Sequence, residues 1–540
     1  MKDISSTGSF INFYLNNYIY VDKTKYIRDL IKLERVFISR PRRFGKSLTL
    51  DTIATLFETG VEPYFKGTWI YDKWTEPTYP VLRLNFLDLD KYSLEHFKQK
   101  LNAIISSFAR DINVKNYEEK VEPEDTIYFL LDELRKEKRQ IVILIDEYDC
   151  QMTANINNET LYKQFQEKIK SFYATIKNKW PIKFLGITGV TRLKDVEIFS
   201  IGSDIRDITN ASAYSQMIGF TRDEIKKYYI DYLTLAASYE NNCSVDKVTD
   251  AQIESMLDMM AQNYDGYCFD EFYKKKVFST WSVNSFFQSI IENKFVYFDE
   301  YWYDNGGLPS ILVNYLKTHE LNIFEYLDKD KFLKVSSDDF KNPTALTTIN
   351  QNVLMCQTGY LTLRSDLKKS STVLLGIPNG EIYKALNRLL AKNIFKGNSD
   401  VTDDQGKNLL EVGSVDDIIN LFNCALNSVS YDNYPIVSES SVQNMLKLYL
   451  LGAHQEVLSE VHEAKGRADL VVNTDNKRIV FEFKYAKNET EAKSKLSEAV
   501  EQIKSRDYGN ILPKKNELLR IAAVFNADPK VRAFTEYQEV

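Results

Sequence analysis

The sequence predicts an α/β protein in three parts: an N-terminal parallel-sheet domain, a helical middle region and a C-terminal mixed α/β domain. From the start to about residue 235, short apolar runs alternate with helical patterns. Helical periodicity then dominates, and strand patterns return after a loop-like stretch, Gly397–Gly413. Because 540 residues exceed what one hydrophobic core usually supports, we expect domains at 1–235, 236–425 and 426–540.

Nearly continuous apolar runs predict strands of the N-terminal sheet that are buried on both faces. They are Arg35–Ser39, Val81–Phe86, Ile141–Ile145 and Lys183–Thr188, with a weaker fifth at Met217–Phe220. Helices are predicted between them at Ser47–Glu58, Leu94–Ala109 and Leu161–Lys177, which gives repeated strand and crossover helix. Thr221 and Glu224 stand at capping-box spacing, so a helix should begin there and end the sheet domain.

The C-terminal part also alternates between strand and helix patterns. The predicted elements are helix Ser441–Leu451, strands Ala468–Asn473 and Arg478–Lys484, helix Lys493–Ser505 and strand Leu518–Phe525. We therefore expect a mixed sheet flanked by helices.

A phosphate-binding loop is predicted in VFISRPRRFGKSLTL, where Gly45-Lys46-Ser47 follows a buried strand and begins a helix. Lys46 would reach the β- and γ-phosphates of ATP, and the Ser47 hydroxyl would bind Mg²⁺. The loop residues expected to line the nucleotide are Arg42, Arg43, Phe44 and Gly45. Arg40 replaces the first glycine of G-x-x-x-x-G-K-[ST], and nucleotide phosphates best explain it and the neighbouring arginines. The alternative is a basic turn before a helix.

A matching acidic pair follows the strand Ile141–Ile145, as in a Walker B motif. Asp146 would hold Mg²⁺ through water, and Glu147 would act as general base on the water that attacks the γ-phosphate. Thr188 is a candidate polar sensor, whereas Arg192 is either a phosphate contact or, more simply, a surface ion pair. An acidic turn is the alternative, but both motifs agree in order and strand context, which favours a P-loop NTPase.

A second site is predicted in GRADLVVNTDNKRIVFEFKYAK, which reads as two strands joined by a polar turn. Glu482 and Lys484 share one face of the second strand, and Asp469 on the first can approach them. The two carboxylates would bind a divalent metal, and Lys484 would position the nucleophile or stabilise the pentavalent phosphate. Glu439 is a weaker candidate ligand, and Gln502 a weaker contact. The alternative is a solvated hairpin with alternating charges.

The segments RPRRFGKS, LIDEYD, YDGY, GYLT, GIPN, GRADLVV and FEFKYAK together resemble the AAA-ATPase-like proteins with a C-terminal PD-(D/E)XK nuclease domain. The resemblance runs nearly end to end. It implies that the glycine-poor loop is the usual form, and that Lys46, Ser47, Asp146 and Glu147 serve the ATPase. Asp469, Glu482 and Lys484 match the nuclease motif. Related exonucleases carry a Gln and a Tyr one helical turn apart, but Gln502 and Tyr508 are six residues apart.

The predicted function is an ATP-binding, ATP-hydrolysing protein coupled to a Mg²⁺-dependent nuclease-like domain that acts on DNA. The alternative is a nucleotide-regulated switch or scaffold whose C-terminal domain binds nucleic acid or protein without cleaving it. The net charge of −7 excludes coating of nucleic acid by bulk basicity, so DNA contact must be local. No apolar run approaches the roughly 18 residues of a membrane span, and the five cysteines lack CxxC pairs. We expect cytoplasmic residence without a membrane partner, and an oligomer remains open.

Overall fold

The computed structural model describes residues 1–177, 179–193, 204–302, 310–316, 319, 323–343, 345–395, 408–453, 455–463 and 466–540. These residues pack into two compact units. The first comprises Met1–His319 and Phe332–Ile382, and the second comprises Glu320–Lys331 and Tyr383–Val540. The division at residues 235 and 425 stays a prediction, and most of the expected loop Gly397–Gly413 lies outside the described residues.

The first unit is built on a parallel sheet with strand order β2-β3-β4-β1-β5. Its strands are β1 (Arg35–Ser39), β2 (Val81–Asn85), β3 (Ile141–Asp146), β4 (Ile182–Gly189) and β5 (Arg206–Asp207). The predicted parallel sheet is confirmed, but the fifth strand was misplaced. Within Met217–Phe220, only Phe220 forms an isolated bridge, to Phe278. The edge strand next to β1 is instead β5, which has only two residues, both charged. So short a polar strand shows no hydrophobic pattern from which it could be predicted.

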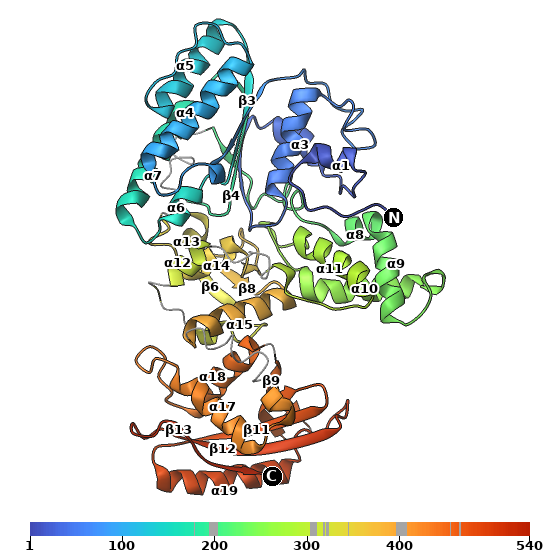
Figure 1. The fold of residues 1–540 in the computed structure, drawn as a ribbon, viewed down its shortest axis with the longest axis vertical. Coiled ribbons are helices and arrows are strands. Elements are labelled where there is room, and N and C mark those ends of the chain that lie inside the picture. Colours follow the sequence, from blue (N-terminus) through green and yellow to red (C-terminus); the bar gives the residue numbers. More distant parts are fainter. Residues whose placement is uncertain are drawn as a thin grey trace. The chain divides into compact units, whose positions relative to one another are not determined.

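Helices cover both faces of this sheet because each presents one apolar stripe. In Figure 1, α1 (Phe10–Leu15) and α3 (Lys46–Thr59) lie on one side. On the other side lie α4 (Leu94–Asp111), α5 (Pro123–Lys136) and α7 (Glu159–Ile176). Two shorter helices, α2 (Thr24–Ile31) and α6 (Cys150–Ala154), complete this part.

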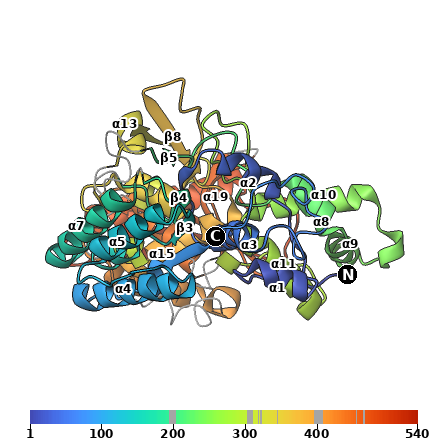
Figure 2. The same ribbon diagram turned by 90° about the horizontal axis from the view of Figure 1, so that it is seen from above.

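A helical group follows the sheet and is seen together in Figure 2. It consists of α8 (Arg222–Tyr228), α9 (Ile230–Glu240), α10 (Asp250–Tyr264) and α11 (Thr280–Asn293). The predicted capping box is confirmed: the side chains of Thr221 and Glu224 each bind the other's backbone at the start of α8. Aromatic residues form much of the core here, including a stacked pair, Tyr229 and Phe287, with ring centroids 5.3 Å apart.

The remainder of the first unit is not purely helical. Besides α12 (Ser310–Leu316), α13 (Ser337–Lys341) and α14 (Gln351–Thr358), it contains a small antiparallel sheet. Its strands are β6 (Leu333–Ser336), β8 (Thr372–Gly376) and β7 (Thr362–Leu363), in that order. The helix α15 (Gly380–Ile394) runs from the end of the first unit into the second.

The second unit contains a mixed five-stranded sheet of order β13-β12-β11-β10-β9. Only the β11–β12 pair is parallel among these neighbours. The strands are β9 (Glu456–Glu463), β10 (Gly466–Asn473), β11 (Lys477–Ala486), β12 (Glu517–Asn526) and β13 (Ala533–Glu539). Figure 1 shows α17 (Val415–Asn427) and α18 (Glu439–Gly452) on one face and α19 (Glu489–Arg506) on the other. The mixed α/β prediction is confirmed, although the polar edge strands β9 and β13 were missed.

None of the helices in the described ranges is long and apolar enough to cross a membrane.

A buried carboxyl group, that of Glu381, lies in the core of the first unit. Glu381, in the sequence motif GIPNGE, has a side chain that is 2% exposed. Its Oε1 accepts a hydrogen bond from the Trp302 N–H at 2.8 Å, and its Oε2 accepts one from Ser282 Oγ at 2.7 Å. Burial raises the pKa of this carboxyl to about 8, because neither hydrogen bond fully replaces water around the charged form.

The first prediction concerns the pH dependence of stability. The folded protein keeps a proton on Glu381 that the unfolded chain loses above pH 4.5, so wild-type stability should fall as pH rises towards 8. Glu381→Gln removes this titration, and its stability relative to wild type should improve between pH 5 and 8 by roughly 3 to 4 kcal/mol. Thermal unfolding at pH 5, 6.5 and 8 measures the difference. The exposed control Glu292→Gln should show no such trend, and a constant difference for Glu381→Gln would contradict the prediction.

Candidate nucleotide and nuclease sites

The loop between β1 and α3 has the backbone of a phosphate-binding turn. Gly45 takes a left-handed conformation, with φ of 99°, immediately before α3 begins at Lys46. A residue with a Cβ would be strained there, which explains the glycine. The free N–H groups at the start of this 14-residue helix are therefore available to an anion, as the sequence predicted.

The two predicted magnesium ligands, Ser47 and Asp146, meet the candidate sensor Thr188 at the carboxyl end of the parallel strands. Ser47 Oγ donates a hydrogen bond to Asp146 Oδ2 at 2.6 Å. Thr188 Oγ1 donates to the other oxygen, Oδ1, which also accepts from the Glu147 N–H at 3.0 Å. The arrangement arises because β3 and β4 pair in parallel, so that their ends share one edge of the sheet. A hydroxyl and a carboxylate side by side fit Mg²⁺, which prefers oxygen ligands.

Lys46 and Glu147 lie beside this group. The Lys46 Nζ is 3.6 Å from Glu147 Oε1, and it donates to the carbonyl oxygens of Arg40 and Pro41 at 3.0 and 3.2 Å. Burial raises the pKa of the Glu147 carboxyl, and the neighbouring carboxylates of Asp149 and Asp146 add to that effect. A carboxylate with a raised pKa accepts a proton from water more readily than an exposed one, as a general base requires.

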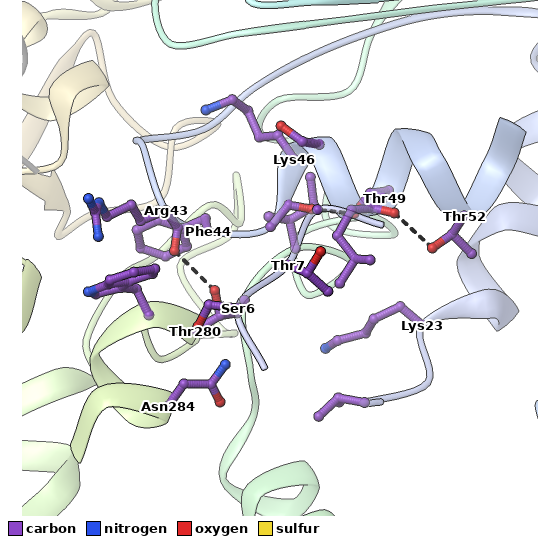
Figure 3. Close-up of a pocket in the computed structure, with 18 of the residues that line it drawn as sticks. Ser6, Thr7, Lys23, Arg43, Phe44, Lys46, Thr49, Thr52, Thr280 and Asn284 are labelled. Atoms are coloured by element: carbon purple, nitrogen blue, oxygen red, sulfur yellow. Dashed lines mark hydrogen bonds between the residues drawn. The ribbon is translucent and has the colours of Figure 1, made fainter. Parts of the chain in front are cut away.

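A cavity of about 500 Å³ adjoins the loop, a size typical of small-molecule sites. Its walls come from four separated segments: Ser5–Gly8, Ile19–Val21, Arg42–Thr49 and Met217–Phe220, together with the first turns of α11. Figure 3 shows Arg43 and Phe44 at one end of this cavity, with Lys23 and Asn284 approaching from the side opposite Lys46. Sequence reasoning missed the walls outside the loop, because no local pattern marks residues that meet only after folding.

Residues of the predicted middle region bind the backbone and one side chain of the loop between β1 and α3. Trp302 Nε1 donates to the Arg42 carbonyl oxygen at 3.2 Å, and Thr280 Oγ1 donates to that of Arg43 at 3.0 Å. The Arg43 guanidinium lies over the Trp281 ring, 3.9 Å from its centroid.

Aromatic packing anchors the same loop. The side chain of Phe44 is 1% exposed and meets Tyr267 edge to face, with ring centroids 4.7 Å apart. It meets Phe269 in the same geometry at 5.6 Å.

Two arginines do not occupy the places that phosphate binding would require. The prediction for Arg40 is wrong, because its guanidinium is 1% exposed and lines a different, smaller cavity. Its carbonyl oxygen alone serves the site, as an acceptor for Lys46. Arg192 forms an ion pair with Asp207, the simpler of its two predicted roles.

The second predicted site forms on the β10–β11 hairpin. Antiparallel pairing sets Leu470 opposite Phe481, and Asp469 Oδ2 accepts a hydrogen bond from the Phe483 N–H at 2.8 Å. Lys484 Nζ donates to Glu482 Oε1 at 2.7 Å and lies 3.5 Å from Glu439 Oε1, on the first turn of α18. The structure thus brings together the predicted residues of both strands and the weaker candidate Glu439.

Burial governs the electrostatics of this hairpin site. It raises the pKa of Asp469 to about 6 and that of Glu482 to about 7, and the mutual repulsion of the two carboxylates adds to the Glu482 shift. Burial opposes the charge of Lys484, but the hydrogen bond to Glu482 and the attraction of the Glu482, Glu439 and Asp469 carboxylates together raise the pKa of Lys484.

A buried oxygen in this site is available to a metal. Glu482 Oε2 has no hydrogen-bond partner among the described residues, which suits a metal ligand. No cluster of three or more His, Cys, Asp or Glu side chains in the described ranges is arranged for a metal, so a cation here would depend on two carboxylates and water. Gln502 lies on α19 and, within the same ranges, makes no side-chain hydrogen bond to the site. Tyr508 is fully buried in the core beneath.

Comparisons with known proteins agree with these two sites. Residues 5–199 match a family described as a predicted AAA-ATPase, and residues 437–534 match the PD-(D/E)XK nuclease superfamily. An uncharacterized protein in the vnfD 5′ region of Azotobacter chroococcum mcd 1 is 25% identical over 532 residues, which covers 95% of this chain and 94% of the relative.

A solved structure, Cdc6p from Pyrobaculum aerophilum, aligns with 68% of this chain and 92% of its own length, at 12% identity and a TM-score of 0.22. That score is too low to support a structural argument. The two matched regions contain Lys46, Asp146, Asp469 and Glu482. The chain therefore contains a region that matches a predicted AAA-ATPase family and a C-terminal region that matches the PD-(D/E)XK nuclease superfamily.

Proposed function

We propose that the first unit binds ATP with Mg²⁺ and hydrolyses it. The observation that carries the proposal is the hydrogen bond between Ser47 Oγ and Asp146 Oδ2 at 2.6 Å. This bond joins the first turn of α3, directly after Gly45, to the carboxylate at the end of β3. Mg²⁺, when bound there, would supply positive charge that offsets the charge of the triphosphate. Ser47 and Asp146 would hold it, and Thr188 would fix the orientation of the Asp146 carboxylate.

The remaining groups have separate roles in this proposal. Lys46, freed from the carbonyls of Arg40 and Pro41, reaches the β- and γ-phosphates, while Gly45 and the first N–H groups of α3 bind their oxygens. Arg42, Arg43 and Phe44 shape the wall beside them. Glu147 accepts a proton from the attacking water, a role that its raised pKa supports.

The second unit, in the same proposal, cleaves nucleic acid in a metal-dependent reaction, with DNA as the favoured substrate. Asp469 and Glu482 would hold Mg²⁺, which would activate water and polarise the scissile phosphate. Lys484, 2.7 Å from Glu482, would position the nucleophile or stabilise charge on the pentavalent phosphate.

All five cysteines are free, which favours residence in a reducing compartment such as the cytoplasm.

A second function is supported by the charge of the C-terminal domain. Residues 431–540 contain 16 Lys and Arg against 17 Asp and Glu, a net of −1, so no basic excess favours tight binding to a phosphate backbone. Lys484 is also already paired with Glu482 and Glu439. In this alternative, the domain binds a nucleic acid or protein without cleaving it, and ATP acts as a switch.

The ATPase proposal predicts that Lys46→Ala lowers the rate of ATP turnover by roughly 100-fold or more, because the phosphate charge loses its ammonium partner. Phosphate release with Mg²⁺ and ATP measures the rate. Lys100→Ala, an exposed lysine on α4, is the matched control and should retain the wild-type rate. Equal turnover in wild type and Lys46→Ala would refute the proposal.

The nuclease proposal predicts that Asp469→Asn abolishes metal-dependent cutting, since a neutral amide binds a divalent cation poorly. Linear, nicked and single-stranded DNA and a single-stranded RNA are incubated with Mg²⁺ or Mn²⁺ and resolved by electrophoresis. Asp475→Asn changes an exposed carboxylate in the turn of the same hairpin and should cut like wild type. Binding without cleavage by wild type and both variants would establish the alternative function.

Coupling between the two activities gives a further test. If nucleotide state gates the C-terminal site, the cutting rate of wild type should change several-fold on addition of ATP, whereas that of Lys46→Ala should not respond. The comparison uses one DNA substrate, with ATP, with a non-hydrolysable analogue and without nucleotide. An identical ATP response in wild type and Lys46→Ala would show that the two sites work independently.

A further inference from the structure

The guanidinium of Arg40 is buried, and only part of its hydrogen-bonding capacity is used by the described residues. Its side chain is 1% exposed, and its Nη1 donates to the carbonyl oxygens of Ser39 and Thr209 at 2.8 and 2.7 Å. Its Nε and Nη2 are buried and have no hydrogen-bond partner among the described residues. One face of the guanidinium lies over the Phe269 ring, 4.1 Å from the centroid. Buried donors left without partners are costly, so a missing partner is expected.

A small cavity lies beside this guanidinium. It measures about 40 Å³, and its lining includes Arg40, Arg192, Thr209, Cys268, Cys356 and Gln357. A site of this size has room for a water molecule or a small ion, but not for a nucleotide or a phosphate group with its oxygens. Arg40 does not contribute to the larger cavity by the phosphate-binding loop, so this is a separate site.

One carboxylate acts on both arginines of the cavity. Asp207 forms an ion pair with Arg192, its Oδ1 accepts a hydrogen bond from the Thr209 N–H at 2.8 Å, and its charge also acts on Arg40. Asp207 makes no hydrogen bond to Arg40, so the Nε and Nη2 of Arg40 keep their lack of a partner among the described residues. Burial lowers the pKa of the Arg40 guanidinium, which reflects the cost of that charge in a site that excludes water.

We propose that this cavity binds one small monovalent inorganic anion, such as chloride, on the free Nε and Nη2 donors of Arg40. The anion would complete the hydrogen bonding of the guanidinium and offset its buried charge. The polarisable thiols of Cys268 and Cys356 are compatible with such a neighbour. Because the Arg40 carbonyl oxygen accepts from Lys46, the anion would also stabilise the loop that holds this lysine.

The test follows thermal unfolding of the full chain while sodium chloride or bromide replaces sodium gluconate at constant ionic strength. Wild type should show a rise in Tm that grows with the logarithm of halide concentration and reaches roughly 4 °C at about 100 times the dissociation constant, since the ligand binds only the folded state. Arg40→Met should lose this rise. Arg135→Met, at an exposed arginine on α5, should keep it.

The wild-type titration alone can overturn the proposal, even if Arg40→Met fails to fold. Equal Tm values in halide and gluconate would mean that the cavity holds only water. A halide response that persists in Arg40→Met would place the anion elsewhere. A crystal grown in bromide gives an independent readout, since anomalous scattering should mark an ion within hydrogen-bond distance of Arg40 Nη2.

Discussion

The arrangement of the first unit depends on one buried carboxylate, that of Asp146, at the edge where the parallel strands end. Two hydroxyl groups, from Ser47 and Thr188, and one backbone N–H converge on it. Each donor comes from a different part of the chain: the start of α3, the end of β4 and the turn after β3. A side chain that is 9% exposed and fully hydrogen bonded has a fixed orientation, and the neighbouring loop is positioned relative to it.

The phosphate-binding loop lacks most of the glycines that usually let such loops turn tightly. Support from outside the loop takes their place. The carbonyl oxygens of Arg42 and Arg43 are held by Trp302 and Thr280, and Phe44 is packed among aromatic side chains. With these carbonyls occupied, the loop is restrained with a single glycine, Gly45, where φ is 99°, and Arg43 takes a left-handed φ of 64° although it is not a glycine.

This restraint gives a structural role to motifs of the middle region whose chemistry is not evident from sequence. In YDGY, Gly266 approaches the Pro378 carbonyl oxygen of GIPN so closely that a Cβ would lie 2.2 Å from it. In GYLT, Gly359 packs against Pro41 of the loop. Glu381, directly after GIPNG, binds the backbone of Trp302, whose indole in turn holds Arg42. These motifs therefore position the loop between β1 and α3 through packing and hydrogen bonds to its backbone.

The sequence by itself determined the buried strands, the glycine before α3, the Thr221 capping box and which side chains could form the two candidate sites, because these depend on local periodicity and residue type. Tertiary structure alone decided which segments enclose the nucleotide cavity, which polar strands pair at sheet edges, and where Arg40 points. Edge strands such as β9, β13 and Arg206–Asp207 carry little apolar signal, since one side lacks a partner strand. Arg40 lies in a basic run that suggests phosphate, yet backbone carbonyls from Ser39 and distant Thr209 direct its guanidinium into the core. Contacts between residues far apart in sequence produce no periodic pattern along the chain, so only the folded structure reveals them.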